Sequence, residues 1–345
     1  MKAVQIHQHG GIEKLRYEES EAPQLTHRSD AIVKLKAASL NHADLSIRRG
    51  FTGLTVPFPH ILGGDGAGTV AAVGDRVTNV KPGDAVCLYP ASGCRRCEYC
   101  VTDREHLCSQ ARALGQGESG TYAEYVRVPA RNCFPIPEGL SFEEAAALPV
   151  AHITAWRMLI THADLKAGET ILILGIGGGV ATAALRLATF IGAQIIVTSG
   201  SDAKLALAKQ LGAAHGINYR STDVAKEVRS RTAKRGADVV VDGVGGDGWV
   251  TSLAALAKGG RLVTCGATTG AQPQTDLRRI FWNNLSIFGS TLGTREEFRQ
   301  VLNFIVVSKT KPVIDRVFPL KHADKAQQRL EDGQQFGKIV LSMAD

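Results

Sequence analysis

The sequence predicts an α/β protein with two domains, one rich in β-strands and one built on a doubly wound parallel sheet. The length of 345 residues corresponds to about two domains of ordinary size. Strand-like runs between Gly and Pro turns fill the first third, and short apolar strands alternate with helical segments from Glu169 onward. Fully apolar strands at that spacing are typical of a parallel sheet covered by helices on both faces.

The β-rich domain is expected to combine the first part of the chain with its C-terminal part. Hydrophobic runs bounded by turns such as Lys81-Pro82-Gly83-Asp84 predict strands in the first part, and further strands and helices are expected after Gly293. The predicted elements are strands at 1–6, 31–36, 68–73, 85–88 and 122–128, a helix at 296–307, a strand at 317–320, a helix at 322–330 and a strand at 338–342.

The middle of the chain is expected to form the second domain, inserted into the first. Ser141-Phe142-Glu143-Glu144 is a capping signature that opens an Ala-rich helix. Apolar strands are then predicted at 170–174, 194–198, 238–241, 261–265 and 285–288, with helices ending near 190 and beginning near 201. This βαβ pattern predicts a Rossmann-type core at 149–292, and the β-rich domain then comprises 1–148 and 293–345.

Composition and charge exclude several classes of protein. The chain is 44% hydrophobic and 21% charged, which excludes disorder, collagen and coiled coil. The net charge of +7 comes without a basic block, so we expect no nucleic-acid partner. The longest uncharged stretch, 171–185, is too short and too rich in glycine to span a membrane. The N-terminus has no apolar core of signal-peptide length, so we expect a cytoplasmic protein with reduced thiols.

Four closely spaced cysteines form the most specific motif in the sequence, Cys94-x2-Cys97-x2-Cys100-x7-Cys108. In a reducing compartment this spacing predicts a tetrahedral zinc, with reduced surface cysteines or an iron–sulfur cluster as the less favoured alternatives. Because all four ligand positions are filled by protein, the predicted zinc has a structural role.

A glycine-rich turn joins the first strand of the middle domain to a helix. The segment reads strand, then Gly175-Ile176-Gly177-Gly178-Gly179, then helix. Glycines let the backbone approach a pyrophosphate, which then lies at the positive N-terminus of the helix. The turn therefore predicts a dinucleotide cofactor.

Together with these two motifs, four segments resemble the medium-chain dehydrogenase/reductase superfamily, which includes zinc alcohol dehydrogenases and quinone oxidoreductases. The segments are Asn41-His42-Ala43-Asp44, Leu62-Gly63-Gly64-Asp65-Gly66-Ala67-Gly68, Val80-Lys81-Pro82-Gly83-Asp84-Ala85-Val86 and Gly120-Thr121-Tyr122-Ala123-Glu124-Tyr125. The resemblance covers essentially the whole chain. It implies an NAD(P)H-dependent enzyme with a GroES-like catalytic domain, a Rossmann cofactor domain and a closed zinc on a lobe at about residues 90–112.

The resemblance also indicates the cofactor. Ser199 aligns with the acidic residue that holds the ribose of NAD, and the missing carboxylate removes repulsion against a 2′-phosphate. Lys204 supplies positive charge, while Asp202 is the competing ribose ligand. NADP(H) is therefore predicted over NAD(H). The residues expected at the cofactor are His42, Thr154, Gly175, Gly177, Gly178, Gly179, Val180, Ala181, Ser199, Ser201, Lys204, Tyr219 and Gly266.

Zinc alcohol dehydrogenases hold a second, open zinc, and this chain departs from their ligand pattern. Matching the motifs places Asn41, Gly64 and Val150 at the ligand positions and Asp65 at the neighbouring acidic position. Gly and Val cannot ligate, so the usual site is lost. Zinc makes an alkoxide accessible at neutral pH, so a site without zinc favours an acceptor that is already electrophilic. The expected substrate is a quinone or an α,β-unsaturated carbonyl compound.

Asn41, Asp44 and Asp65 are the expected catalytic residues, with Asn41 orienting the substrate and Asp44 supporting it. For Asn41 and Asp44 the alternative is structural hydrogen bonding within the loop. Two other functions stay open: a zinc alcohol dehydrogenase with a rebuilt catalytic metal, and a non-catalytic cofactor-binding protein similar to some lens crystallins of this family. The side chains that could rebuild the metal site are His42, His60, Asp65 and His152.

Assembly is also predictable. The strand at 285–288 comes last in the core and should form an edge of the parallel sheet. An apolar edge is prone to pairing with another strand, and the adjacent Arg278-Arg279-Ile280-Phe281-Trp282 supplies aromatic area typical of interfaces. We therefore expect a homodimer, or a tetramer built from such dimers.

Overall fold

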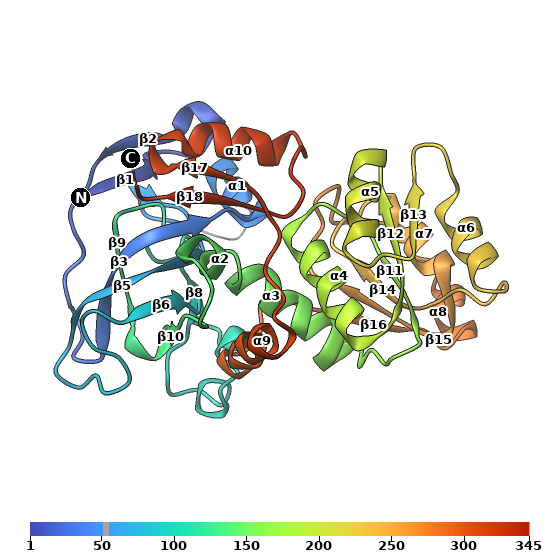
Figure 1. Cartoon of the computed structure of the whole chain (residues 1–345), viewed down its shortest axis with the longest axis horizontal. Helices are drawn as coiled ribbons and strands as arrows, with labels where there is room; N and C mark the ends of the chain where they lie inside the picture. The colour runs from blue at the N-terminus through green and yellow to red at the C-terminus, as the bar shows by residue number, and fades with distance from the viewer. Residues whose placement is uncertain (51–54, 345) are drawn as a thin grey trace. The chain divides into compact units, whose positions relative to one another are not determined.

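The computed structural model describes residues 1–50 and 55–344, and the chain divides into two compact units (Figure 1). Unit 1 comprises Met1–Ala151 and Thr294–Asp345, and unit 2 comprises His152–Gly293. The boundaries predicted from the sequence fall after residues 148 and 292, whereas those of the structure fall after residues 151 and 293. No helix among the described residues is long and apolar enough to cross a membrane.

Unit 1 is built around a seven-stranded, mostly antiparallel sheet whose main path runs β10-β6-β5-β3-β18-β17, with β9 also paired to β3. Two smaller sheets, β2-β1-β4 and β7-β8, belong to the same unit. The strands are β1 (Lys2–Ile6), β2 (Arg16–Glu19), β3 (Asp30–Ser39), β4 (His60–Ile61), β5 (Asp65–Val73), β6 (Ala85–Leu88), β7 (Ala91–Ser92), β8 (Arg112–Ala113), β9 (Tyr125–Pro129), β10 (Cys133–Pro135), β17 (Ile314–Pro319) and β18 (Lys338–Ser342).

The helices of unit 1 include α1 (His42–Arg49), α2 (Phe142–Ala146), α9 (Arg295–Ser308) and α10 (Ala323–Glu331), while α3 (Pro149–Trp156) begins in unit 1 and continues into unit 2. The capping box predicted at Ser141 is confirmed, since Ser141 Oγ accepts from Glu144 N at 3.2 Å and the Glu144 carboxylate accepts from Ser141 N at 2.9 Å. The Ala-rich helix is short. It ends at Ala146, before Pro149, which lacks the N–H that a continuing helix needs.

Strand register brings three distant parts of the sequence to one end of the large sheet. Asp65, at the start of β5, pairs with Ser39 at the end of β3. On the other side of β3, Val340 of β18 pairs with the same Ser39. Asp65 and Lys338 therefore come from the two strands that flank this end of β3.

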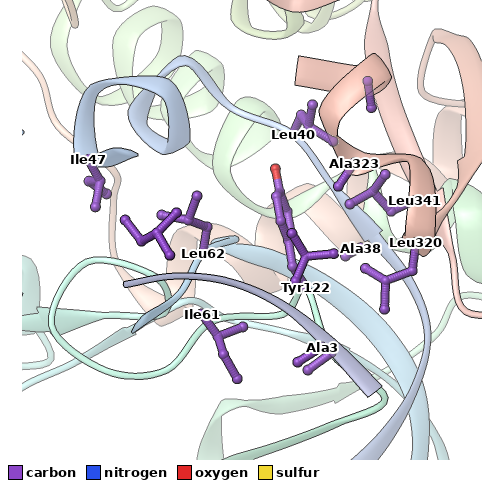
Figure 2. Close-up of a cluster of buried hydrophobic side chains, with 14 of the residues drawn as sticks. Ala3, Ala38, Leu40, Ile47, Ile61, Leu62, Tyr122, Leu320, Ala323 and Leu341 are labelled. Atoms are coloured by element: carbon purple, nitrogen blue, oxygen red, sulfur yellow. The ribbon is translucent and has the colours of Figure 1, made fainter. Parts of the chain in front are cut away.

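A hydrophobic cluster anchors the segments that lead to this end of the sheet. The Tyr122 ring lies in it among Ala38, Leu40 and Leu62 (Figure 2), all of which are buried. The predicted strand at 122–128 begins only at Tyr125, because Tyr122 and Ala123 instead make single backbone contacts to β1. The backbone that carries Asn41 and Gly64 thus continues directly from buried core residues.

Unit 2 contains a six-stranded sheet in the order β13-β12-β11-β14-β15-β16, and every pairing in it is parallel, as predicted. Its strands are β11 (Thr170–Ile173), β12 (Gln194–Ser199), β13 (His215–Asn218), β14 (Ala237–Asp242), β15 (Leu256–Thr264) and β16 (Ser286–Gly289). Its helices are α4 (Gly179–Ile191), α5 (Asp202–Gln210), α6 (Val224–Arg231), α7 (Gly248–Ala255) and α8 (Leu277–Trp282), with a π-helical segment at Arg157–His162.

The last strand, β16, forms an edge of this sheet, as the sequence predicts. Ile287 on β16 is exposed, as are Leu277, Phe281 and Trp282 on α8, with Trp282 76% exposed. Phe288 differs, because its ring stacks on His162 within the unit at a centroid distance of 5.6 Å. We propose that β16 pairs with its counterpart in a second copy of the chain, the aromatic residues of α8 adding apolar area.

Light scattering at micromolar concentration is therefore expected to find a dimer or a tetramer of dimers. Ile287→Lys and Trp282→Lys place a charge at the exposed edge and should shift the protein toward smaller species, without disturbing the Phe288 contact. Val307→Lys is the matched control, because Val307 is an exposed apolar residue of α9 in unit 1. A monomeric wild-type protein would overturn this assembly.

Candidate functional site

The four predicted cysteines converge, and their Sγ atoms all lie within 4.8 Å of one another. A tetrahedral zinc with Zn–S bonds of about 2.3 Å needs sulfur atoms about 3.8 Å apart. Backbone amides already point at the sulfurs: Cys97 N donates to Cys94 Sγ at 3.4 Å, and Gln110 N donates to Cys108 Sγ at 3.3 Å. These residues fit a structural zinc.

Buried charge ties the cysteine lobe to the rest of unit 1. Glu105 is completely buried, and its carboxylate accepts from Arg295 Nε at 2.7 Å. Arg295 also pairs with Asp103. It belongs to the first turn of α9 and lies 190 positions after Glu105 in the chain. These ion pairs thus join the cysteine lobe to the start of α9.

A second polar cluster lies where β5, β3 and β18 meet. Asp65 is completely buried, and its carboxylate accepts four hydrogen bonds. Oδ2 accepts from Ser39 Oγ at 2.9 Å, Asn41 Nδ2 at 2.8 Å and Lys338 Nζ at 2.9 Å, and Oδ1 accepts from Val150 N at 2.8 Å. The Asp65 charge is therefore paired and fully hydrogen-bonded, which is the condition for burying an ion pair.

Asp44 holds the start of α1. Its Oδ2 accepts from Asn41 N at 2.8 Å, and this contact is part of a capping box. The same oxygen also accepts from Tyr122 OH at 2.9 Å. Burial raises the pKa of Asp44 to about 6, and the two hydrogen bonds act in the opposite direction. Asp44 thus fixes the backbone of Asn41, and its contacts are those of the structural alternative given in the sequence analysis.

The positions that bind the open zinc in alcohol dehydrogenases lie together. Asn41 donates to Asp65, Val150 N donates to the same carboxylate, and a Cβ on Gly64 would be 3.6 Å from Val150 Cγ2. A glycine and a valine offer no side-chain ligand, and the Asp65 oxygens are occupied by four donors, one of them an ammonium. These residues do not fit a catalytic zinc.

The other candidate metal ligands are not gathered. His60 is buried with its Nε2 2.9 Å from Gly115 O, His42 is exposed at the start of α1, and His152 lies on α3 in unit 2. Within residues 1–50 and 55–344, the four cysteines are the one group of three or more His, Cys, Asp or Glu whose ligand atoms converge.

The glycine turn of unit 2 has the geometry expected of a pyrophosphate site. Gly175 and Gly177 have φ values of 64° and 129°, which glycine adopts without the strain that a Cβ would add. Gly178 precedes α4 and supplies no side-chain cap. The first backbone N–H groups of α4, those of Gly179, Val180 and Ala181, can therefore bind an anion at the positive end of the helix.

Strands β12 and β13 end beside each other, where Ser199 pairs with Asn218. Ser199 is buried, and its Oγ accepts from Ser201 N at 3.1 Å. Ser201 in turn begins α5, its Oγ accepting from Lys204 N at 3.5 Å. Two serine hydroxyls therefore lie at the turn where NAD enzymes of this architecture carry a carboxylate, and Lys204 follows in the first turn of α5.

Tyr219 and Arg220 follow β13 and lie against this turn. A Cβ on Gly200 would be 2.9 Å from the Tyr219 hydroxyl and 2.7 Å from Arg220 Nε, and both side chains are exposed. Asp202 lies in the first turn of α5, where its Oδ1 accepts from Asn218 Nδ2 at 2.8 Å. The guanidinium of Arg220 adds positive charge beside the turn.

Three predicted cofactor residues lie elsewhere. Thr154 is buried on α3, and Gly266 follows β15, where a Cβ would be 3.2 Å from Gly243 O at the end of β14. His42 belongs to unit 1, whereas the glycine turn belongs to unit 2.

Two charged residues near these sites, Lys338 and Arg220, were not predicted from the sequence. Lys338 was predicted only as the first residue of an apolar strand. A lysine in such a strand was itself a signal, because lysines are rarely buried without a partner. Arg220 directly follows Tyr219, which was predicted.

Comparisons with known proteins agree with this fold. Residues 27–138 match the alcohol dehydrogenase GroES-like domain, and residues 179–307 match the zinc-binding dehydrogenase family. A zinc-type alcohol dehydrogenase-like protein of Schizosaccharomyces pombe is 36% identical over 96% of both chains, and an alcohol dehydrogenase of Geobacillus stearothermophilus is 32% identical over 99% of this chain and 100% of its own.

Solved structures are similar over the whole chain. A structure named as that of an NAD-dependent alcohol dehydrogenase has a TM-score of 0.96 and 40% identity over 100% of both chains. A crotonyl-CoA carboxylase/reductase in complex with NADP has a TM-score of 0.91 and 25% identity, over 99% of this chain and 94% of its own. The fold and site thus define an NAD(P)-type oxidoreductase with a GroES-like and a Rossmann domain. The chain belongs to the medium-chain dehydrogenase/reductase superfamily, as a zinc-type alcohol dehydrogenase-like member.

The cysteine cluster predicts one tightly bound zinc per chain. Cys97→Ser should reduce the zinc content, measured by elemental analysis, to near zero and lower the thermal unfolding midpoint by several degrees, because metal binding and folding of the lobe are coupled. Cys265→Ser, a change at a thiol outside the cluster, should keep the zinc. A Cys97→Ser protein with a full complement of tightly held zinc would contradict the assignment.

Proposed function

We propose that the protein is an NADPH-dependent reductase of quinones or α,β-unsaturated carbonyl compounds that works without a catalytic zinc. One observation carries the proposal: the positions of the open metal in zinc alcohol dehydrogenases are occupied here by an amide, a glycine and a valine that lie together. These residues offer a hydrogen-bond donor in place of a set of metal ligands.

The chemistry fits an acceptor that is already electrophilic. Reducing such an acceptor requires stabilisation of the oxygen on which negative charge develops, and a positioned N–H group provides it. NADPH, when bound, supplies the hydride. Asn41 can donate its amide N–H to the acceptor oxygen, Asp44 holds the backbone of Asn41, and Asp65 holds its carboxamide. No side chain is assigned the proton, which solvent can supply.

The preference for NADPH rests on the end of β12. A carboxylate is missing at Ser199, while Arg220 and Lys204 supply positive charge near the turn. A guanidinium can form charge-assisted hydrogen bonds with a 2′-phosphate, which NADPH has and NADH lacks. The relative named as an NADP complex supports the same choice, whereas several relatives are named as NAD-dependent.

An alcohol dehydrogenase with a rebuilt second zinc is the alternative, and the names of the relatives favour it. The occupied Asp65 carboxylate argues against it, because zinc there would have to displace the Lys338 ammonium. The number of metal ions per chain separates the two functions: one zinc supports the reductase, and two zincs, with activity lost on mild chelation, support the alcohol dehydrogenase.

The first test is a panel of quinones, enones and simple alcohols. The protein, with one zinc per chain, is expected to oxidise NADPH with at least one quinone or enone, and Asn41→Ala should lower kcat about 10²-fold, as loss of an oxyanion donor does elsewhere. Asn79→Ala, which removes an amide that donates to Ala130 O in the same unit, should leave kcat unchanged. Oxidation of alcohols without reduction of any acceptor would overturn the proposal, as would NADPH binding without any turnover.

The second test concerns the cofactor. Arg220→Gln should raise KM for NADPH about tenfold and leave KM for NADH unchanged, because one charge-assisted hydrogen bond is lost. Ser199→Asp should act in the same direction by repelling the phosphate. Arg231→Gln is the matched control, since Arg231 pairs with Glu227 on α6. If NADPH preference survives both site variants, the 2′-phosphate does not bind at this turn.

A further inference from the structure

We propose that Lys338 is a positioning residue, which together with Asp65 locks the Asn41 carboxamide so that one N–H faces the acceptor oxygen. The inference rests on the proposed function, because it assigns the group that orients its oxyanion donor. Lys338 lies on β18, far in sequence from Asn41, and nothing in the local sequence around Asn41 indicates its role.

The Lys338 ammonium is buried, with 3% of the side chain exposed, and each of its three N–H groups has an acceptor. Nζ lies 2.6 Å from Leu40 O, 2.7 Å from Asn41 Oδ1 and 2.9 Å from Asp65 Oδ2. An ammonium has three donors and no acceptor, so these contacts use its whole capacity. Lys338 therefore has no N–H left for a substrate and acts through its neighbours.

These neighbours leave the Asn41 amide one orientation. The ammonium can only donate, so it requires the amide oxygen on its side, and the Asp65 carboxylate can only accept, so it requires the amide nitrogen, which lies 2.8 Å away. The flipped amide would direct N–H at an ammonium and oxygen at a carboxylate. Both contacts would be repulsive, so the pair of charges acts as a two-sided lock.

In this arrangement one of the two N–H groups of the Asn41 amide is not used by Asp65. An amide nitrogen carries two N–H groups, and Asp65 accepts one of them. Asn41 is only half-buried, and we infer that its second N–H is available to an acceptor oxygen. An amide whose oxygen accepts from an ammonium is polarised and is a stronger N–H donor. Lys338 thus strengthens the hydrogen bond to the acceptor oxygen without touching it.

Removing Lys338 alone would leave the buried Asp65 charge without its partner and could unfold the protein. The test therefore uses the double change Asp65→Asn/Lys338→Met, which removes both charges that hold the Asn41 amide in one orientation. Asp315→Asn/Arg329→Met is the matched control, because it removes another ion pair of unit 1 that makes no contact with Asn41. Thermal unfolding and circular dichroism establish that each variant is folded.

The decisive measurement is a cycle with Asn41→Ala. The double variant should lower kcat at least tenfold, keep the Kd for NADPH, and have no further effect on kcat in the Asn41→Ala background. The control pair should lower stability and keep kcat. Wild-type kcat in the double variant, or effects that multiply with that of Asn41→Ala, would overturn the inference, because Lys338 would then not act through Asn41.

A second readout does not depend on turnover. In protein with ¹⁵N-labelled asparagine, the side-chain signals of Asn41 are those lost in Asn41→Ala. The lock predicts one pair of amide protons with one proton shifted downfield by the carboxylate, and loss of that shift in the double variant. Two amide-proton signals at the positions typical of a solvent-exposed asparagine side chain in the wild type would overturn the lock. An ordered Asn41 amide in a protein that reduces no acceptor would instead refute the proposed function and leave the lock intact.

Discussion

A buried ammonium and a buried carboxylate are stable only if each satisfies the other, and this requirement organises unit 1. Asp65 opens β5 and Lys338 opens β18, 273 positions apart, and both strands pair with the same end of β3. Any slip in either register would separate the charges and leave each without a partner in a place that water does not reach. The register of three strands and the geometry of the candidate site are therefore one constraint.

This constraint also explains what the site can do. In a zinc enzyme a metal ion provides positive charge at the oxygen of the substrate. In the proposed reductase the positive charge is that of Lys338, it is neutralised by Asp65, and it acts on the reacting oxygen only through the neutral Asn41 amide. A neutral donor stabilises charge that develops during hydride addition but does not lower the pKa of an alcohol as a metal ion does. This difference is the physical reason for proposing reduction of a quinone or an α,β-unsaturated carbonyl compound over oxidation of an alcohol.

How well the sequence predicts a feature depends on how far apart in the chain the residues of that feature lie. The zinc cluster and the glycine turn are local, so spacing alone predicts that Cys94 to Cys108 converge and that Gly175 to Gly178 join β11 to α4. The parallel sheet follows from apolar strands, whereas β13 and α6 to α8 were not predicted, because amphipathic segments such as α6 carry many charges. Lys338 and Arg220 could not be assigned, since their roles depend on strand pairing and on a turn packed against Gly200.

The two metal positions of the family differ for the same reason. The cysteine lobe needs only residues within one short loop, together with the Glu105–Arg295 contact that ties it to α9, so it can persist whatever happens at the reacting atoms. An open metal site requires ligands from separate segments, here the residues at 41, 64 and 150, and a single glycine among them removes it. Once it is lost, the polar residues left behind must satisfy one another. Asn41 does so between Lys338 and Asp65, and in the proposed reductase its remaining N–H is the group that polarises the hydride acceptor.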